Sequence, residues 1–523
     1  MTPWWPARLL LALGSGLALA LAFPSYNLPL LAWIAVAGLL LASLGARPGQ
    51  AACAGFLHGA VFYTATLPWI YTVMYVHGAL SPVSAAGVLA ALVAAASLFP
   101  AAFSLGVAWL GRRSAAHGLV AATFLWVALE FGRTHLPGIG FPWNLIGYAA
   151  SKNLALLQLA PFTGVYGLSF LVVAYNAVFA GMLVGSRRPH VLGFCLVVTA
   201  TLLAVAGLGG RFVPVSHSRF VAHLVQTNFP QSPSYPADWI ERHAPELDEL
   251  ERLSIAAAEK SPGLLIWPEV PAPFYLQDRR FVARVERIAG AARSAFLVGV
   301  VDWKLGPRGG LAPYNSAALF DPSGQRVFLY DKIHLVPFGE YVPLHRWLTF
   351  AKTLTAEVGD YQPGSEYKVG ALAPDAGGGK FGVFICYEAI FPAEVRRFVS
   401  SGAELLINLS NDGWFGRSAA PEQHLGMARV RAVENRRWLL RDTNNGFTTA
   451  IDPYGRYAAR LATDVRGVLG APYDFRSDST LYARWGDWLA WLCVAAALYF
   501  IGAGLARRRQ ALRSSHLAPL DCI

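Results

Sequence analysis

The residue best placed to act as a nucleophile in this sequence is Cys386. It follows the apolar run 381–385, which has the composition of a β-strand, and Tyr387 and Glu388 come directly after it. The end of a strand is a rigid place from which to present a reactive side chain. The thiolate is the reactive form of cysteine, so a catalytic cysteine needs a base or a positive charge nearby. The alternative is a buried cysteine that only packs in a core.

Two segments upstream of the cysteine can supply a base and a charge. The segment 264–269 is a short apolar run that ends on the carboxylate Glu269, and the segment 330–340 carries Lys332 and Glu340. Three strand-type segments therefore end on Glu, Lys and Cys, in that order. This combination favours a catalytic thiol over a packing cysteine.

The composition of the chain indicates a membrane protein with a soluble middle region. The 523 residues are too many for one ordinary domain, and they are 55% hydrophobic and 14% charged, with a mean hydropathy of +0.40. Residues 1–216 hold one acidic residue and nine Lys or Arg, whereas residues 217–484 hold 29 acidic and 30 basic residues. The net charge of +11 thus belongs mostly to the apolar regions. Such a pattern is typical of membrane topology and contact with anionic lipid, and it speaks against nucleic-acid binding.

Eight apolar segments are each long enough to cross a hydrocarbon core of about 30 Å. We place them at 8–24, 28–45, 54–75, 83–110, 116–132, 162–185, 190–208 and 485–505. The first could instead be a cleaved signal peptide, but Phe23-Pro24-Ser25 is a poor cleavage site and we favour a retained helix. The predicted domains are a seven-helix transmembrane region at 1–216, a globular domain at 217–475, and an eighth transmembrane helix with a basic tail at 476–523.

Arginines in the short connections predict the orientation, because such residues concentrate on the cytoplasmic side. They fall on alternate connections and in the tail: Arg47, Arg112, Arg113, Arg187, Arg188, Arg507, Arg508, Arg509 and Arg513. With a cytoplasmic N-terminus and seven spans before it, the globular domain lies outside the cytoplasm. In a bacterium with two membranes, this predicts an inner-membrane protein with a periplasmic domain.

The region 217–475 alternates between strand-type and helix-type segments, which predicts an α/β domain whose strand ends meet at an active site. The expected strands are 219–226, 263–268, 296–302, 315–320, 326–330, 381–386, 404–409 and 446–451. The expected helices are 238–259, 278–293, 391–401 and 421–437. We find no Walker loop, dinucleotide fingerprint or zinc-type spacing, so the sequence predicts neither a metal nor a cofactor.

The motifs around Glu269, Lys332 and Cys386 resemble those of the nitrilase superfamily, whose fold is an αββα sandwich with a Glu-Lys-Cys triad. Together with the seven-plus-one apolar segments, the chain resembles the bacterial apolipoprotein N-acyltransferase family over nearly its full length. Further matching stretches are Val225-Gln226-x-Asn228-x-Pro230-Gln231, Asn411-Asp412-Gly413-Trp414-Phe415-Gly416, Pro421-Glu422-Gln423-His424 and Thr443-Asn444-Asn445-Gly446.

This resemblance implies an acyl transfer without metal or cofactor. Glu269 is then the general base for Cys386, which attacks an acyl ester of a membrane phospholipid. Lys332 and the backbone N–H of Tyr387 stabilise the oxyanion. The resulting thioester passes its acyl group to the free α-amine of the diacylglyceryl cysteine at the N-terminus of an apolipoprotein, with ping-pong kinetics.

The resemblance also implies supporting residues. Glu340 and Glu388 would orient Lys332 or neighbouring backbone, because an unpaired carboxylate would raise the pKa of the nucleophile. The tryptophan that the family places after its Asn-x-Pro-Gln motif corresponds to Tyr235 in an ungapped match, or to Trp239 after a local shift. Further candidate lipid contacts are Trp414, Phe415 and the apolar stretch 341–355. We expect a monomer.

Two other classes of protein fit part of the sequence. A membrane-tethered amidase of the nitrilase type would use the same triad with water in place of the amine, but eight spans exceed what a tether needs. A transporter with an external domain predicts ionisable groups inside the spans, which here are nearly free of them. The sequence therefore favours the acyltransferase.

Overall fold

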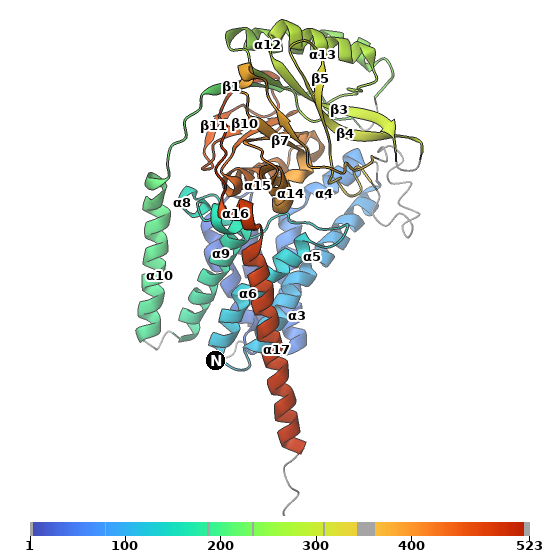
Figure 1. Cartoon of the computed structure of the whole chain (residues 1–523). Coiled ribbons are helices and arrows are strands. Elements are labelled where there is room, and N and C mark those ends of the chain that lie inside the picture. The colour runs from blue at the N-terminus through green and yellow to red at the C-terminus, as the bar shows by residue number, and fades with distance from the viewer. Residues whose placement is uncertain are drawn as a thin grey trace, which may run out of the picture.

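Two six-stranded β-sheets lie face to face above a bundle of helices in the computed structural model of the chain (Figure 1). The structure describes residues 4–78, 80–185, 189–232, 235–306, 309–341 and 361–516. The sheets belong to the α/β region, and the bundle is built from the apolar segments on either side of it.

The first sheet has the strand order β12-β1-β2-β3-β4-β5. Its strands are β1 (Phe220–Gln226), β2 (Leu264–Ile266), β3 (Ala295–Leu305), β4 (Leu311–Phe320), β5 (Arg326–Asp331) and β12 (Gly467–Tyr473). Strands β1, β2 and β3 are parallel, and β4 runs against β3 and β5. Strands β2 and β5 therefore point the same way, and their carboxyl ends lie at the same edge of the sheet.

The second sheet has the strand order β11-β10-β9-β8-β7-β6. Its strands are β6 (Val369–Ala371), β7 (Lys380–Ile385), β8 (Leu405–Ser410), β9 (Trp438–Thr443), β10 (Thr449–Ile451) and β11 (Tyr457–Arg460). The central strands β7, β8 and β9 are parallel, so the residues that follow them gather at one edge.

Helices cover both outer faces and complete an αββα sandwich. The first sheet carries α12 (Ala244–Lys260) and α13 (Arg279–Ala292), and the second carries α14 (Pro392–Ser400) and α15 (Ala420–Asn435) (Figure 1). Strand β2 shows why its sequence is continuously apolar: Leu264 and Ile266 face the other sheet, whereas Leu265 packs among α12 and α13. Both faces of the strand are buried, as is typical of parallel sheets under helices.

The bundle contains a helix in each of the eight expected apolar segments. These helices are α1 (Trp5–Leu21), α2 (Ala32–Ser43), α3 (Pro48–Thr66), α5 (Pro82–Leu110), α6 (Ala115–Thr134), α9 (Ala160–Gly185), α10 (Pro189–Leu208) and α17 (Trp488–His516). Within the described ranges, five stretches are long and apolar enough to cross a membrane: 82–110, 115–134, 160–185, 192–212 and 488–510. The apolar helices at 5–21 and 29–43 are shorter. The chain is thus a membrane protein with at least these five candidate spans.

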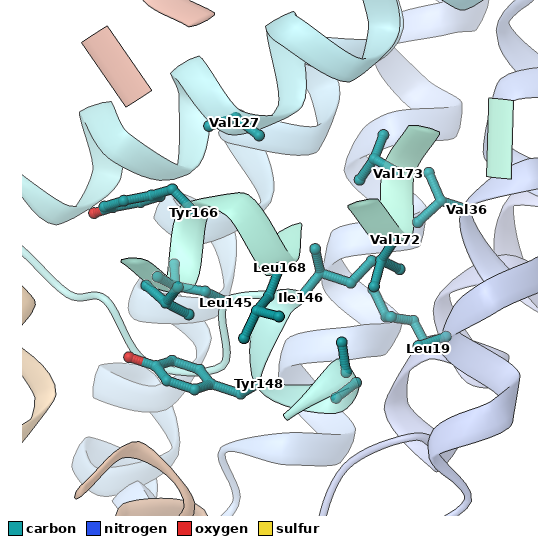
Figure 2. Close-up of a cluster of buried hydrophobic side chains, with 14 of the residues drawn as sticks. Leu19, Val36, Val127, Leu145, Ile146, Tyr148, Tyr166, Leu168, Val172 and Val173 are labelled. Atoms are coloured by element: carbon teal, nitrogen blue, oxygen red, sulfur yellow. The ribbon is translucent and has the colours of Figure 1, made fainter. Parts of the chain in front are cut away.

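The core of the bundle continues into the sandwich. Figure 2 shows Ile146 and Tyr148, from the connection between α6 and α9, packed beside Leu168 and Val172. The same buried cluster includes Val430 and other residues of α15. Because α15 lies between the second sheet and the bundle, the α/β domain and the membrane helices share one apolar core and hold each other in place (Figure 1).

Polar contacts at the start of α15 fix the same junction. The Gln423 amide donates to the backbone carbonyls of Pro24 and Thr66 at 2.9 and 3.1 Å, and its oxygen accepts from the Trp143 indole at 2.6 Å. Further along the helix, Glu434 accepts from the Val165 N–H at 2.8 Å. One face of α15 is therefore anchored to the bundle.

The strand and helix predictions differ from the structure in a few places. The expected helix 238–259 is divided into α11 (Trp239–Arg242) and α12, and the expected strand 446–451 shortens to β10. The expected span 54–75 is divided into α3 and α4 (Trp69–Thr72). Strands β6, β9, β11 and β12 were not predicted, nor were the short helices α7 (Gly147–Ala150), α8 (Leu154–Leu157) and α16 (Leu481–Trp485). Apart from Tyr341, the apolar stretch 341–355 lies outside the described residues, as do Arg187 and Arg188.

Candidate active site

The three residues predicted to form a triad gather where strands of the two sheets end. Glu269 follows β2, Lys332 follows β5 directly, and Cys386 follows β7 directly. The Lys332 ammonium lies 3.0 Å from the Glu269 carboxylate and 2.9 Å from that of Glu340. Only 1% of the lysine side chain is exposed. The structure therefore holds a buried cation between two carboxylates, next to the buried thiol.

Asn315, on β4, joins the two carboxylates and was not predicted from the sequence. Its amide donates to Glu269 and to Glu340, each at 2.8 Å. The backbone N–H of Asn411, just after β8, donates to the other oxygen of Glu269 at 2.9 Å. The Glu269 carboxylate is thus oriented by both sheets. A lone asparagine in the otherwise apolar strand β4 was the available signal for this role.

The two other glutamates hold backbone as well as side chains. Glu340 accepts from the Val336 N–H at 2.8 Å, which closes the loop that follows Lys332. Glu388 accepts from the N–H groups of Ile333 and Ile385, both at 2.7 Å, and so ties the segment after β5 to the end of β7. Burial raises the pKa of Glu388 to about 7, although these hydrogen bonds oppose the shift. The geometry makes both residues positioning groups around Lys332 and Cys386.

Cys386 stands in a conformation that its sequence does not reveal. Strand β7 ends at Ile385, and Cys386 begins a short 3-10 helix (Cys386–Ile390) with φ of 47°. A side chain other than glycine in this left-handed region costs about 1–3 kcal/mol and persists only where the surroundings impose it. The chain therefore turns sharply between the end of β7 and the 3-10 helix, and Tyr387 is the second residue of that helix.

The thiol is the stable ground state of the nucleophile. Burial raises the pKa of Cys386 well above its ordinary value, the Glu269 carboxylate raises it further, and Lys332 opposes both. Burial alone would lower the pKa of Lys332, but Glu269 and Glu340 outweigh burial and hold it well above the usual range. The site therefore pairs a neutral thiol with a permanent cation, and attack requires a base that takes the thiol proton.

Alkylation of Cys386 by iodoacetamide is expected to keep accelerating with pH beyond about 9, because a raised pKa leaves its thiolate fraction small and still growing there, whereas an ordinary thiol with a pKa of about 8.5 is mostly ionised by then. Peptide mass spectrometry after timed alkylation separates Cys386 from the cysteines of the bundle. A rate that levels off below about pH 8 would mean a preformed thiolate paired with Lys332, and the need for a base would disappear.

Aromatic rings from the segments that follow β7 and β8 pack against the bundle. Trp414 contacts His77 with ring centroids 5.2 Å apart, and Phe415 contacts Trp69 at 5.2 Å. Tyr387 is buried and belongs to the same apolar cluster as the bundle core. These rings place an apolar wall between the nucleophile and the membrane helices.

The structure separates the other two candidate lipid contacts from this wall. Trp239 is buried in the cluster under α12 and α13, where its ring stacks on His243 with centroids 4.2 Å apart. Tyr235 packs against Trp239 at 5.9 Å and stays partly exposed. Of this pair, Tyr235 is the residue with surface left for a ligand.

An αββα sandwich with a buried Glu-Lys pair beside a cysteine defines a protein of the nitrilase class, and a carbon-nitrogen hydrolase family model matches residues 224–477. The model of the apolipoprotein N-acyltransferase N-terminal domain matches residues 15–178. The apolipoprotein N-acyltransferase of Geobacter metallireducens is 40% identical over 514 residues, covering 96% of each chain. That of Azotobacter vinelandii is 34% identical, covering 97% of this chain and 96% of its own. The chain belongs to the apolipoprotein N-acyltransferase family and is an acyltransferase.

Two solved structures are each similar to about half of the chain. An amidase from Nesterenkonia sp. is 21% identical, with a TM-score of 0.37, and covers 52% of this chain and 94% of its own. A nitrilase-superfamily protein from Saccharomyces cerevisiae is 19% identical, with a TM-score of 0.38, and covers 50% and 93%. The full-length relatives named above carry the acyltransferase name, so the amidase alternative has less support.

Proposed function

We propose that the chain moves a fatty acyl group from a membrane phospholipid to the α-amine of the N-terminal diacylglyceryl cysteine of an apolipoprotein, through a thioester on Cys386. The observation that carries the proposal is the buried Lys332, paired with Glu269 and Glu340 beside a thiol, in a domain that shares its core with apolar helices. The family to which the chain belongs supports the acceptor.

In the first half of the reaction, Glu269 takes the Cys386 proton as the sulfur attacks the ester carbonyl carbon. Lys332 and the Tyr387 N–H stabilise the tetrahedral oxyanion. The ester C–O bond then breaks, Glu269 returns the proton to the departing alkoxide, and lysophospholipid leaves. The acyl group remains on the sulfur as a thioester.

In the second half, the acceptor amine attacks the thioester carbonyl and loses a proton to Glu269. The C–S bond breaks, Glu269 protonates the sulfur, and the product is an N-acyl amide with Cys386 restored as a thiol. Because the two substrates use one site in turn, the kinetics are ping-pong. The residues in this scheme need no metal or cofactor.

The membrane topology is part of the proposal: eight spans, a catalytic domain on the periplasmic side of a bacterial inner membrane, and a monomer. Figure 1 supports an even number of crossings, since the N-terminal end and the far end of α17 lie on the side of the bundle away from the sheets. The proposal also includes domain boundaries at 216/217 and 475/476, which lie outside the range from β1, beginning at Phe220, to β12, ending at Tyr473.

A site on top of the bundle suits two lipid substrates. Withdrawing an acyl chain into water costs about 0.8 kcal/mol per methylene. Trp414 and Phe415 contact aromatic side chains of the bundle, which supports an approach of the acyl chains along this side of the domain. We assign Trp414 and Phe415 to acyl-chain contact, Tyr235 to the outer edge of the site, and Trp239 to support behind it.

The test is mass spectrometry of the purified protein after incubation with phospholipid. We expect a fatty-acyl adduct on the Cys386 peptide that hydroxylamine removes and that Cys386→Ala lacks. Adding a diacylglyceryl peptide with a free N-terminal amine should discharge the adduct as N-acyl peptide, whereas an N-acetylated peptide should leave it intact. If small amides or nitriles form an adduct and phospholipid does not, the chain is an amidase and the proposal is wrong.

A further inference from the structure

A buried polar chain ends on the backbone carbonyl of Cys386. The His424 Nε2 lies 3.0 Å from that oxygen, and the His424 Nδ1 lies 3.2 Å from the Arg441 guanidinium. Arg441 also binds the Asp412 carboxylate at 2.8 and 3.0 Å. All three side chains have no exposed surface. None of the three side chains contacts the reacting groups in the proposed scheme. Their burial and their hydrogen bonds therefore indicate a role other than direct participation in the chemistry.

The partners of His424 fix its tautomer. A carbonyl oxygen can only accept, so Nε2 carries the proton and donates to Cys386. A guanidinium can only donate, so Nδ1 is unprotonated and accepts from Arg441. Asp412 Oδ1 lies 3.5 Å from Nδ1 and is itself held by Arg441, which leaves the assignment unchanged. Burial, together with the Arg441 charge, lowers the pKa of His424, in keeping with a neutral ring.

We infer that His424 is a positioning residue for the acyl transfer, which holds the Cys386–Tyr387 peptide in the orientation that catalysis needs. The inference rests on the proposed role of Cys386. The carbonyl and the N–H of a trans peptide point in opposite directions. A hydrogen bond that fixes the Cys386 oxygen therefore also fixes the direction of the Tyr387 N–H, the proposed oxyanion donor. The same bond holds Cys386 at its φ of 47°.

His424 also connects the nucleophile to the membrane helices. Its ring stacks on Trp143 with centroids 5.8 Å apart and an angle of 27° between the planes. Trp143 is fully buried and donates to Gln423, the neighbour of His424 that binds Pro24 and Thr66. Two neighbouring residues at the start of α15 therefore have different partners: Gln423 binds the bundle, and His424 binds Cys386.

Two amide substitutions at this position separate positioning from packing. The amide nitrogen of His424→Gln can occupy the place of Nε2, whereas that of His424→Asn can reach only the place of Nδ1. Both are neutral amides of similar polarity. We expect His424→Gln to form the Cys386 thioester at close to the wild-type rate, and His424→Asn to form it about a hundredfold more slowly at an unchanged KM for phospholipid, a loss comparable to that of an oxyanion donor.

The matched control is His223→Gln, because His223 is also buried and donates to a backbone carbonyl, that of Ser261, at 2.8 Å. It should leave the rate unchanged. Iodoacetamide alkylation of Cys386 in the same variants measures the positioning of the thiol without phospholipid. If phospholipid fails to acylate the wild type, the alkylation rates still test the role of His424, so failure of the proposed function can be distinguished from failure of this inference. Equal rates for the Gln and Asn variants in both measurements, or rates that only follow the melting temperature, would overturn the inference.

Discussion

Lys332→Met is expected to lower the rate of Cys386 acylation by about a thousandfold and the free energy of unfolding by about 3–5 kcal/mol. Methionine is unbranched and one atom shorter than lysine, so it keeps most of the apolar stem and removes the ammonium group with its charge and hydrogen bonds. Glu269 and Glu340 would then face each other around Asn315 without the cation that both contact. Removing one partner from a buried ionic cluster is costly because the remaining charges stay desolvated.

The loss of rate has a separate cause from the loss of stability. Without Lys332, the developing oxyanion keeps only the proposed Tyr387 N–H, and one missing donor or charge at such a site costs about 10²–10³ in rate. Single-turnover acylation followed by mass spectrometry measures the first quantity, and denaturant unfolding in detergent measures the second.

Lys304→Met is the matched control for Lys332→Met. Lys304 lies on β3 of the same sheet and pairs with Asp331 at 2.6 Å, but a third of its side chain is exposed. An ion pair in such a position contributes about 0–1 kcal/mol. We expect this variant to acylate at the wild-type rate. If both lysine variants lose the same stability and keep their activity, Lys332 is only a structural cation.

Strands β2 and β7, which precede Glu269 and Cys386, were predictable because they are buried runs of mostly apolar residues. Strand β2 shows this most clearly, with a short run of buried aliphatic residues followed by Glu269. Glu269, Lys332 and Cys386 were predicted from the residue types at the ends of three strand-type segments, and the structure places Glu269 and Lys332 within 3.0 Å of each other. The pattern places a functional residue at a strand end, but not its partners on other strands.

Strand β9 was missed for the opposite reason. Its sequence, Trp438–Thr443, contains Arg441 and Asp442, and both are fully buried. A buried arginine is stable here only because Asp412 and His424 meet it in space, and both come from elements that are distant in the sequence. The residues next to Arg441 in the sequence therefore cannot predict this contact. The contacts of His424 with Arg441 and Cys386 were not predicted for the same reason, although His424 belongs to a motif that matched the family.

Strand β12 shows how a partner remote in sequence determines a strand. Its residues Gly467–Tyr473 include two glycines and a proline, which weaken any local preference for a strand. It forms through antiparallel pairing with β1, from Phe220↔Tyr473 to Gln226↔Gly467. The conformation of Cys386 is a similar case, because its φ of 47° depends on the contacts around the 3-10 helix Cys386–Ile390 and not on the residue itself.

The membrane helices were predicted in position more accurately than in length. The expected span 28–45 contains a short 3-10 helix, Pro29–Leu31, before α2 begins at Ala32, and it ends at Ser43, before Gly45 adopts a positive φ. Hydropathy alone extends a segment across such interruptions. A helix such as α5, which continues for 29 residues, is long enough to cross a membrane.

Glu269→Gln is expected to slow Cys386 acylation by about 10²–10⁴-fold, because the amide cannot take the thiol proton. The amide oxygen can still accept a hydrogen bond from Asn315 or Lys332, and the substitution keeps the size of the side chain, although the amide nitrogen cannot accept from the Asn411 N–H as the second carboxylate oxygen does. Attack then depends on thiolate formed by ionisation alone. Since burial raises the pKa of Cys386, the residual rate should climb about tenfold per pH unit between pH 7 and 9, whereas the wild-type rate should change less.

Glu340→Gln is the control that separates a base from a neighbouring charge. Glu340 contacts the same Lys332 ammonium at 2.9 Å and the same Asn315 amide at 2.8 Å, so this substitution removes one carboxylate from the cation as Glu269→Gln does. It leaves the proton acceptor in place, and we expect a smaller loss of rate with no new pH dependence. An equal loss in the two variants would mean that Glu269 acts through Lys332 and not by taking the proton. An activated ester, whose leaving group departs without protonation, is a second test of the role of Glu269. With this substrate, Glu269→Gln should no longer slow the departure of the leaving group. It should still slow the attack of the thiol, with the same pH dependence.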